Sequence, residues 1–289
     1  MGVGLLDPKG SARFVSKSQP IARAYHGLLK GKVQTTMHKV ITAAVCTALI
    51  GAMTHAVRSD ELSPTYPIPD IVQRAATIYQ AEVRGVVGMQ RHFTTVVHAG
   101  PVHHTEHSDS GFVMHDGTFT RIKYYQIADD GQPFTAQQTA IRESQTNRAW
   151  SEGKIFFKEP YDERFLGDYQ YEVAAACEGC AEGTLAVTFK SDIKDNQHGS
   201  GTMWIDAAGH VIKVEFSPNQ LPPHANWGTV TETATEVMPG AWYVTQIQAT
   251  YKGRLLLLTG GATFTATFDH FHRFDRVGDA DAALDNGSI

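Results

Sequence analysis

The stretch Gly201–Phe216, GTMWIDAAGHVIKVEF, decides how the rest of the chain is interpreted. Two apolar runs flank Asp206-Ala-Ala-Gly209. In a strand, alternate residues share a face, so one face of the second run carries Ile212, Val214 and Phe216. Asp at the start and Gly at the end of the corner are typical of a type I turn. The stretch predicts a β-hairpin in which Asp206 shapes the turn, and not a catalytic Asp206–His210 pair, because no nucleophile or orienting third group lies near it in sequence.

Strand-like runs continue through most of the chain around this hairpin. They lie at 88–99, 111–127, 154–159, 169–176, 183–191, 228–237, 241–251, 254–258 and 262–274. The HDG sequence at 115–117 is typical of a hairpin turn between two strands. Short turns and the lack of a repeating helix predict an antiparallel sheet or open barrel of about nine to eleven strands.

Two segments have helical patterns. After Asp70, which we expect to cap the helix, the apolar residues recur every three or four positions as far as Gly85: Ile71, Val72, Ala75, Ile78, Tyr79 and Val83. A helix with one apolar stripe must lie on another element. The segment Pro133–Trp150 has a low density of β-branched residues, and its few apolar positions predict a second helix. The predicted fold class is therefore α+β.

The beginning of the chain predicts export. Met37–Ala56, MHKVITAAVCTALIGAMTHA, has a basic flank at Lys39, an apolar stretch and a small-x-small ending, as a secretory signal peptide does. The apolar stretch is too short to span a bilayer comfortably. We expect residues 1–36 to be a basic leader outside the mature protein, 57–69 an extended lead-in, 70–275 one domain and 276–289 a flexible tail. If the signal is not cleaved, it would anchor the protein to the membrane.

The hairpin, written G-x-M-W-I-D…G-x-V-I-K-V-E, follows an export signal and an amphipathic helix. In this it resembles the bacterial outer-membrane lipoprotein carrier (lipoprotein-sorting protein) superfamily. The resemblance implies an unclosed, strongly curved antiparallel half-barrel, with helices against its concave face. It also implies periplasmic binding of acyl chains or other hydrophobic ligands, without catalysis or cofactor. The family's lid-latching arginine has no clear counterpart, although Arg84 and Arg91 lie near the right region.

Apolar side chains near the C-terminus are the candidates for a ligand-binding face. Along 262–274, strand alternation places Phe264, Phe268 and Phe274 on one face. Leu255 and Leu257 belong to an apolar run, as in a strand that is covered on both sides. The same residues would also fill an ordinary core, so a structural or partner-binding envelope protein stays open as an alternative.

Histidines offer another alternative, a metal-binding module or metal-dependent enzyme. His103, His104 and His107 lie close together in a segment that Gly and Pro mark as turn-rich, and a solvated loop is the ordinary explanation for them. His270 and His272 form an H-x-H pair that could present two imidazoles to one ion. Histidines at the edge of a core would give the same pattern.

Two cysteines, Cys177 and Cys180, lie in the sequence CEGC. In an exported chain they predict a local disulfide, while redox chemistry and metal binding remain the alternatives. The chain has no G-x-S-x-G elbow, phosphate-binding loop or dinucleotide motif. Its net charge of −5 makes it a poor counterion for nucleic acid. We therefore expect a periplasmic or secreted protein that binds a hydrophobic small molecule, lipid or lipoprotein, without catalysis or cofactor and with an envelope protein as a second partner.

Overall fold

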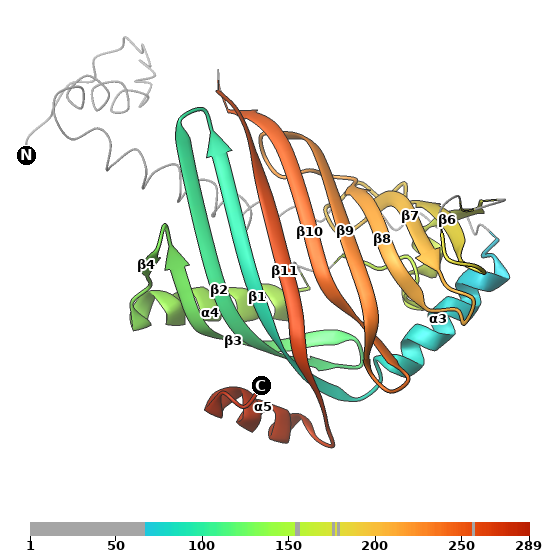
Figure 1. The fold of residues 1–289 in the computed structure, drawn as a ribbon, viewed down its shortest axis with the longest axis horizontal. Coiled ribbons are helices and arrows are strands. Elements are labelled where there is room, and N and C mark those ends of the chain that lie inside the picture. Colours follow the sequence, from blue (N-terminus) through green and yellow to red (C-terminus); the bar gives the residue numbers. More distant parts are fainter. Residues whose placement is uncertain (1–66, 154–156, 175–176, 178–179, 256–257) are drawn as a thin grey trace, which may run out of the picture. The chain divides into compact units, whose positions relative to one another are not determined.

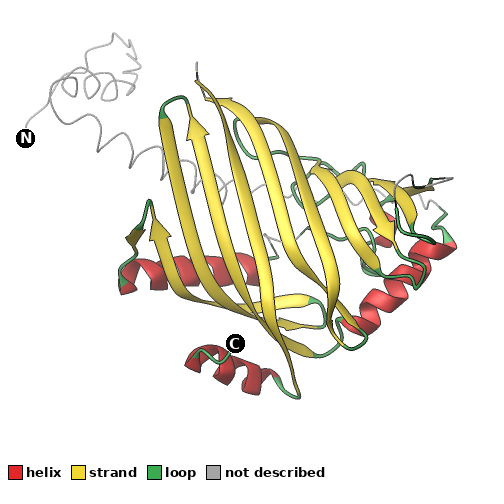
Figure 2. Ribbon diagram, viewed as in Figure 1, coloured by secondary structure: helices red, strands yellow, loops and turns green. Residues whose placement is uncertain are grey.

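The computed structural model describes residues 67–289, except 154–156, 175–176, 178–179 and 256–257. Over this range the chain forms one antiparallel sheet of 11 strands, in the order β4-β3-β2-β1-β11-β10-β9-β8-β7-β6-β5 (Figures 1 and 2). The sheet is not closed, because β4 and β5 are its edges and do not pair with each other. The predicted α+β class and unclosed half-barrel are confirmed. The predicted leader (1–36), the signal (37–56) and the lead-in as far as residue 66 lie outside the described residues.

The elements have the following bounds along the chain: α3 (Asp70–Glu82), β1 (Val86–Ala99), β2 (Val102–His115), β3 (Thr118–Asp129), β4 (Gln132–Pro133), α4 (Ala136–Ser151), η1 (Leu166–Asp168), β5 (Gln170–Val173), β6 (Leu185–Lys190), β7 (Gly199–Ile205), β8 (Val211–Pro218), β9 (Ala225–Met238), β10 (Ala241–Leu255), β11 (Leu258–Phe274) and α5 (Val277–Asn286). The predicted hairpin is β7–β8, with Met203 opposite Val214. The predicted strand at 154–159 is wrong for residues 157–159, which form no strand.

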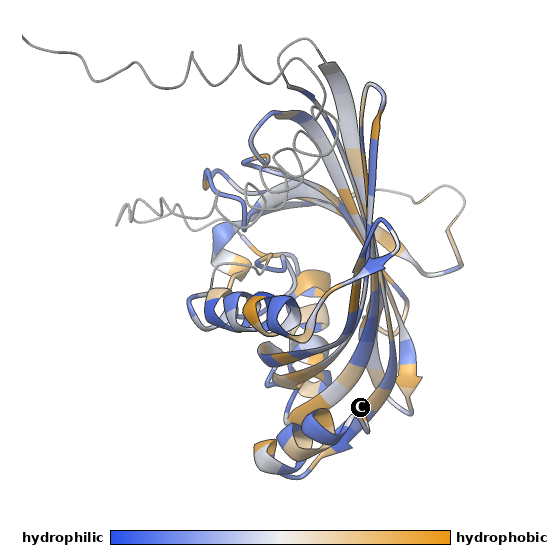
Figure 3. Cartoon of the chain, turned by 90° about the vertical axis from the view of Figure 1, so that its left-hand side faces the viewer, coloured by the Kyte–Doolittle hydropathy of each residue, from blue (hydrophilic) through white to orange (hydrophobic). Residues whose placement is uncertain are grey.

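One face of the sheet is apolar along most of its width, and we call it the inner face. The cross-strand register places Met203, Val214, Val230 and Ala249 on it, together with Phe264. Figure 3 shows the sheet curving around the side on which helices and loops lie. Burial of this face against those elements supplies the main stabilisation of the fold.

Helix α3 covers the inner face near β7–β10. Its apolar stripe buries Val72 and Ala75 among the core side chains of the sheet. The predicted cap is wrong: Asp70 is the first helical residue, and the N-cap is Pro69, which has no side-chain hydrogen bond. At its far end, Val83 packs with Val87 and Met89 of β1.

Helix α4 has a weak apolar pattern because polar side chains hold it against β3. Its polar side chains satisfy backbone groups of β3: Asn147 accepts from the Ile122 amide (2.8 Å) and donates to the Ile122 carbonyl (3.0 Å), and Glu143 accepts from the Tyr124 amide (3.1 Å). Because β4 has only two residues, most of the β3 edge would otherwise be unpaired. Thr135 and Gln138 close a capping box, and Trp150 supplies the buried contact with Phe112. The second predicted helix is confirmed.

The C-terminal segment differs from the prediction of a flexible tail. Residues Val277–Asn286 form α5, which buries Ala280 and Leu284, and the terminal Ile289 is fully buried. These side chains pack on Val86 and Val113. Both positions alternate with inner-face residues, so α5 covers the outer face of the sheet. An Asp- and Ala-rich sequence obscured the few apolar residues that hold the helix in place.

No helix in the part of the chain that the structure describes has the length and apolar character needed to cross a membrane.

Candidate functional site

A cavity of about 670 Å³ lies between the inner face, α3 and the loop that follows α4. Most of the cavity wall consists of apolar or aromatic side chains. They include Phe157, Phe165, Phe216, Leu221, Val230, Ile247, Ala249, Tyr251 and Phe268. Such a volume and lining are typical of a small-molecule site.

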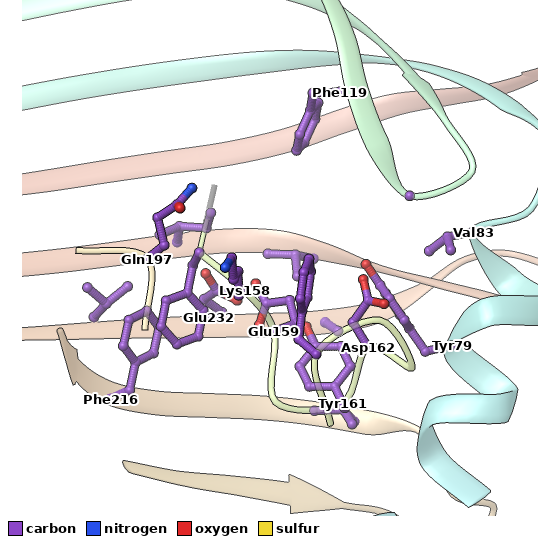
Figure 4. A pocket seen from close by; sticks show the side chains of 18 of the residues that line it. Tyr79, Val83, Phe119, Lys158, Glu159, Tyr161, Asp162, Gln197, Phe216 and Glu232 are labelled. Carbon is purple, nitrogen blue, oxygen red and sulfur yellow. The ribbon is translucent and has the colours of Figure 1, made fainter. Parts of the chain in front are cut away.

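Two glutamates interrupt this apolar wall. Glu232 lies on the inner face of β9, opposite Val214 and Ile247, and is 6 % exposed. Glu159, from the loop after α4, is hydrogen-bonded to it. Figure 4 shows both side chains in the cavity, beside Lys158. The Oε2 atom of each carboxyl is buried and has no hydrogen-bond partner among the described residues.

Burial perturbs the titration of both carboxyls. It raises the pKa of Glu232 to about 7, although the hydrogen bond from Glu159 partly opposes the rise. Burial also raises the pKa of Glu159 well above its usual value, and the nearby charge of Glu232 raises it further. Near neutral pH the pair therefore retains a proton, and the Glu159 carboxyl donates to the Glu232 carboxylate.

The groups around this pair are mostly satisfied by one another. Tyr79 of α3 and Tyr161 meet edge to face, with ring centroids 5.0 Å apart, and burial raises the pKa of both phenols. Asp162 is buried and binds the Arg164 guanidinium at 2.5 Å, and it also accepts from Gln80 at 2.9 Å. Among the described residues that line the cavity, the buried side-chain polar atoms without a hydrogen-bond partner are the Oε2 atoms of Glu159 and Glu232 and Oε1 of Glu82.

The Asp206–Gly209 corner is the turn that the sequence predicts. Asp206 Oδ1 accepts from the backbone amides of Gly209 (2.7 Å) and His210 (2.8 Å), and Gly209 has a φ of +101°. Burial raises the pKa of Asp206, but these bonds and one from the His210 ring outweigh it, so that the pKa is lowered. Arg74 of α3 donates to the Ala208 carbonyl (2.8 Å), so the corner also holds α3 on the sheet.

His210 reaches the edge of the cavity from this corner. Its ring stacks on Trp242 with centroids 4.8 Å apart, and its Nε2 lies 3.4 Å from Oε1 of Glu82. Burial raises the pKa of Glu82 to about 7, and the nearby His210 opposes that rise. The sequence did not indicate this further buried carboxyl, at the end of α3.

The predicted ligand-binding residues do not share one face. Phe268 lines the cavity, and Phe264 packs in the inner-face core. Phe274 instead packs beside Ile289 under α5, on the outer face. The cause is a β-bulge at His270, whose φ is +51°, because one inserted residue reverses the alternation after it. The backbone of Leu255 ends β10 but its side chain is not described, and Leu257 lies outside the described residues.

The same bulge changes the H-x-H prediction. His270 and His272 are both exposed, and His270 binds its neighbour Asp269 at 2.9 Å. The other predicted histidines lie on β2 and not in a loop: His103 and His107 point to the outer face, whereas His104 is buried on the inner face. Its Nδ1 lies 2.9 Å from Oδ1 of Asp129 and 3.3 Å from Oδ2 of Asp130. Over the described ranges, His104, Asp129 and Asp130 form the group whose potential metal-ligand atoms all lie within 4.8 Å of one another.

Cys177 and Cys180 form a disulfide in the segment between β5 and β6. Neither cysteine is among the described residues that line the cavity.

Sequence reasoning missed the glutamate pair. Glu232 occurs in TVTETATEV, where Glu232 and Glu236 alternate with threonines, so its position between Val230 and Ala234 on the inner face is a weak signal. Glu159 comes from a segment predicted as a strand. Only the register of β9 and the course of the loop bring the two carboxyls together.

No protein-family model matches the chain, and no curated protein matches it in sequence. Among solved structures, it is similar to a LolA superfamily protein from Nitrosomonas europaea (12% identity, TM-score 0.32, 74% of this chain and 99% of the other). It is also similar to a DUF1329 family protein from Desulfovibrio piger (11% identity, TM-score 0.36, 78% of this chain and 100% of the other). A third similar structure is a putative outer membrane lipoprotein-sorting protein domain from Vibrio parahaemolyticus (10% identity, TM-score 0.34, 74% of this chain and 98% of the other). The first and third of these proteins bear the name of the superfamily that the hairpin resembles.

Proposed function

We propose that this chain is an exported, non-catalytic protein that binds a hydrophobic ligand, such as a lipid or the acyl chain of a lipoprotein, in the inner-face cavity. The observation that carries this proposal is the cavity of about 670 Å³ on the inner face of the sheet, whose wall is mostly apolar. A filled core would have closed this space, because protein interiors pack densely. The signal-like segment at 37–56 and the superfamily that the hairpin resembles support a periplasmic location.

The geometry of the two carboxyls supports binding over hydrolysis. Glu159 and Glu232 contact each other directly. A pair that cleaves glycosidic bonds needs carboxyls roughly 5–9.5 Å apart, with the substrate between them. A pair in direct contact leaves no room for such a substrate, so we assign these groups to ligand recognition.

A fluorescent displacement assay tests the proposal. The neutral apolar dye N-phenyl-1-naphthylamine should bind the full chain saturably, and a C12 amphiphile should displace it. Ala234→Trp places a large ring in the cavity wall and should abolish dye binding. Thr235→Trp, one residue further along β9, adds the same ring to the exposed outer face and should leave binding unchanged. Equal dye binding by both variants would contradict a cavity site.

A second candidate function is cation binding at His104, Asp129 and Asp130, which the distances above favour. An imidazole nitrogen and two carboxylate oxygens are ligands that Zn²⁺ accepts. Isothermal titration with Zn²⁺ should give one site per chain that His104→Ala removes and His103→Ala, on the outer face of the same strand, retains. Equal heats for both variants would exclude this site.

A further inference from the structure

We propose that the cavity recognises an amphiphile whose polar end is a protonated amine, and that Glu232 and Glu159 bind this ammonium group. This inference rests on the proposed function and adds the chemical class of the ligand's polar end. It is carried by three observations on the described residues: two unpartnered carboxyl oxygens, the charge balance of the wall and the aromatic rings around it.

The unpartnered oxygens are the first observation. Glu232 is 6 % exposed, yet its Oε2 has no hydrogen-bond partner, and Oε2 of Glu159 is in the same condition. A buried acceptor without a partner destabilises the folded protein. Packing alone would favour an apolar residue here, since the cross-strand neighbours of Glu232 are Val214 and Ile247. A ligand that donates hydrogen bonds would satisfy both oxygens.

The charge of the wall is the second observation. Four carboxyls line the cavity, from Glu82, Glu159, Asp162 and Glu232, against the cations of Lys158 and Arg164. The Arg164 guanidinium is already engaged: its Nε and Nη2 donate to Asp162, and its Nη1 donates to Thr118 Oγ1 at 2.8 Å. The Lys158 ammonium lies over the Phe165 ring, 5.4 Å from its centroid. The remaining carboxyls favour a cationic ligand group over an anionic one.

Aromatic rings are the third observation. Tyr161 is adjacent to the pair: burial raises its pKa, and the charges of Glu159 and Glu232 raise it further. Tyr79 meets Tyr161 edge to face. The faces of such rings attract an ammonium group, which can donate three hydrogen bonds to the carboxyl oxygens. The acyl chain would then extend along the apolar wall toward Phe216 and Leu221.

The test compares three C12 probes that differ only at the polar end: dodecylamine, dodecanol and dodecanoic acid. Each displaces N-phenyl-1-naphthylamine from the full chain at pH 7, below its aggregation concentration. A charge-assisted hydrogen bond is worth about 1.5–3 kcal/mol, so we expect dodecylamine to bind at least about tenfold more tightly than dodecanol. In Glu232→Gln this preference should fall to within about threefold. Glu215→Gln, which removes an exposed carboxylate on the neighbouring strand, should keep the full preference.

Each outcome has a definite meaning. Equal binding of the three probes overturns the amine assignment and leaves hydrophobic binding intact. Tightest binding of dodecanoic acid also overturns it, since Lys158 would then set the polarity. An amine preference that Glu232→Gln retains assigns the effect to the net negative charge of the protein and overturns the role of the pair. Absence of any saturable dye binding contradicts the proposed function itself.

Discussion

Replacing Glu232 by Gln should stabilise the protein at alkaline pH and leave its stability nearly unchanged in acid. The side chain lies between apolar neighbours on the inner face, and burial raises its pKa from 4.5 to about 7. In the unfolded chain the carboxyl ionises near its ordinary pKa, so the unfolded state releases the proton first as pH rises. Rising pH between 4.5 and 7 therefore favours unfolding.

The pKa difference gives the size of this effect. A rise from 4.5 to about 7 corresponds to roughly 3 kcal/mol once both states are ionised. The contribution is close to zero near pH 4, where both states are protonated, and reaches its full value near pH 8. Glutamine keeps the shape of the side chain and an acceptor for the Glu159 carboxyl. The variant should therefore gain about 3 kcal/mol over the parent protein at pH 8.

Urea unfolding of the full chain at several values between pH 4 and pH 8, followed by circular dichroism, measures the difference directly. Glu159 is the neighbour whose titration changes with this substitution: without the Glu232 charge its pKa rises less, which adds to the gain at pH 8 with the same sign. Glu215→Gln, on the exposed face of β8, serves as the control and should show no pH-dependent difference. A Glu232→Gln difference that stays constant from pH 4 to pH 8, or that destabilises at pH 8, would refute the assignment of a buried ionising carboxyl.

Three further predictions concern the rest of the fold. The ring nitrogens of the fully buried His198 lie 2.8 Å from Asp195 and 3.1 Å from Asp168, so His198→Phe should lower the free energy of unfolding by about 3 kcal/mol at pH 6, as measured by urea unfolding. Burial lowers the pKa of His198, but the bonds to the two aspartates outweigh it and the pKa is raised. The loss of stability in the variant should therefore shrink as pH rises above the unfolded value of 6.5. Leu284→Ala should cost about 2–5 kcal/mol in the same assay, whereas Val277→Ala at an exposed position of α5 should cost little, and equal effects would contradict the docking of α5. Thiol titration of the unreduced, denatured full chain should find one sulfhydryl, that of Cys46, and three would contradict the disulfide.

The fold was predictable from the sequence where local patterns and tertiary packing agree. Alternation and turn residues located β7–β8, and the apolar stripe of the first helix located α3, because both elements bury one continuous face. The second helix was harder to predict, since Asn147 and Glu143 hold it on the backbone of β3 and not through apolar contacts. A helix held by polar contacts of this kind does not need apolar residues every three or four positions, so the sequence shows no such repeat. The terminal helix was missed because it buries only Ala280, Leu284 and Ile289, and its other contacts with the sheet include polar ones, such as the Arg121–Asp285 ion pair at 2.6 Å.

The candidate site was less predictable because its residues meet only through register and loop course. Strand alternation placed Phe264, Phe268 and Phe274 together, but the bulge at His270 sends the last of them to the outer face. A bulge at a histidine has no strong sequence signal, and its effect reverses every position after it. Phe271 is an odd number of residues from Phe268, so unbroken alternation would put it on the outer face, but after the bulge it packs with Tyr243 on the inner face.

The inner face that results is not a uniform apolar core, and this bears on what it can bind. If the face served only to cover helices, Glu232 would be an uncompensated loss in stability at neutral pH, and any apolar residue of similar size would remove it. Glu232 is buried, it is hydrogen-bonded to a second carboxyl, and it lies in the wall of a cavity. These three features occur together at one place on the inner face. Groups held in an unfavourable protonation environment are concentrated at functional sites. Glu232→Gln is therefore expected to have two effects with one cause, the removal of the buried charge. It should increase the stability at pH 8, and it should abolish the preference for an amine ligand.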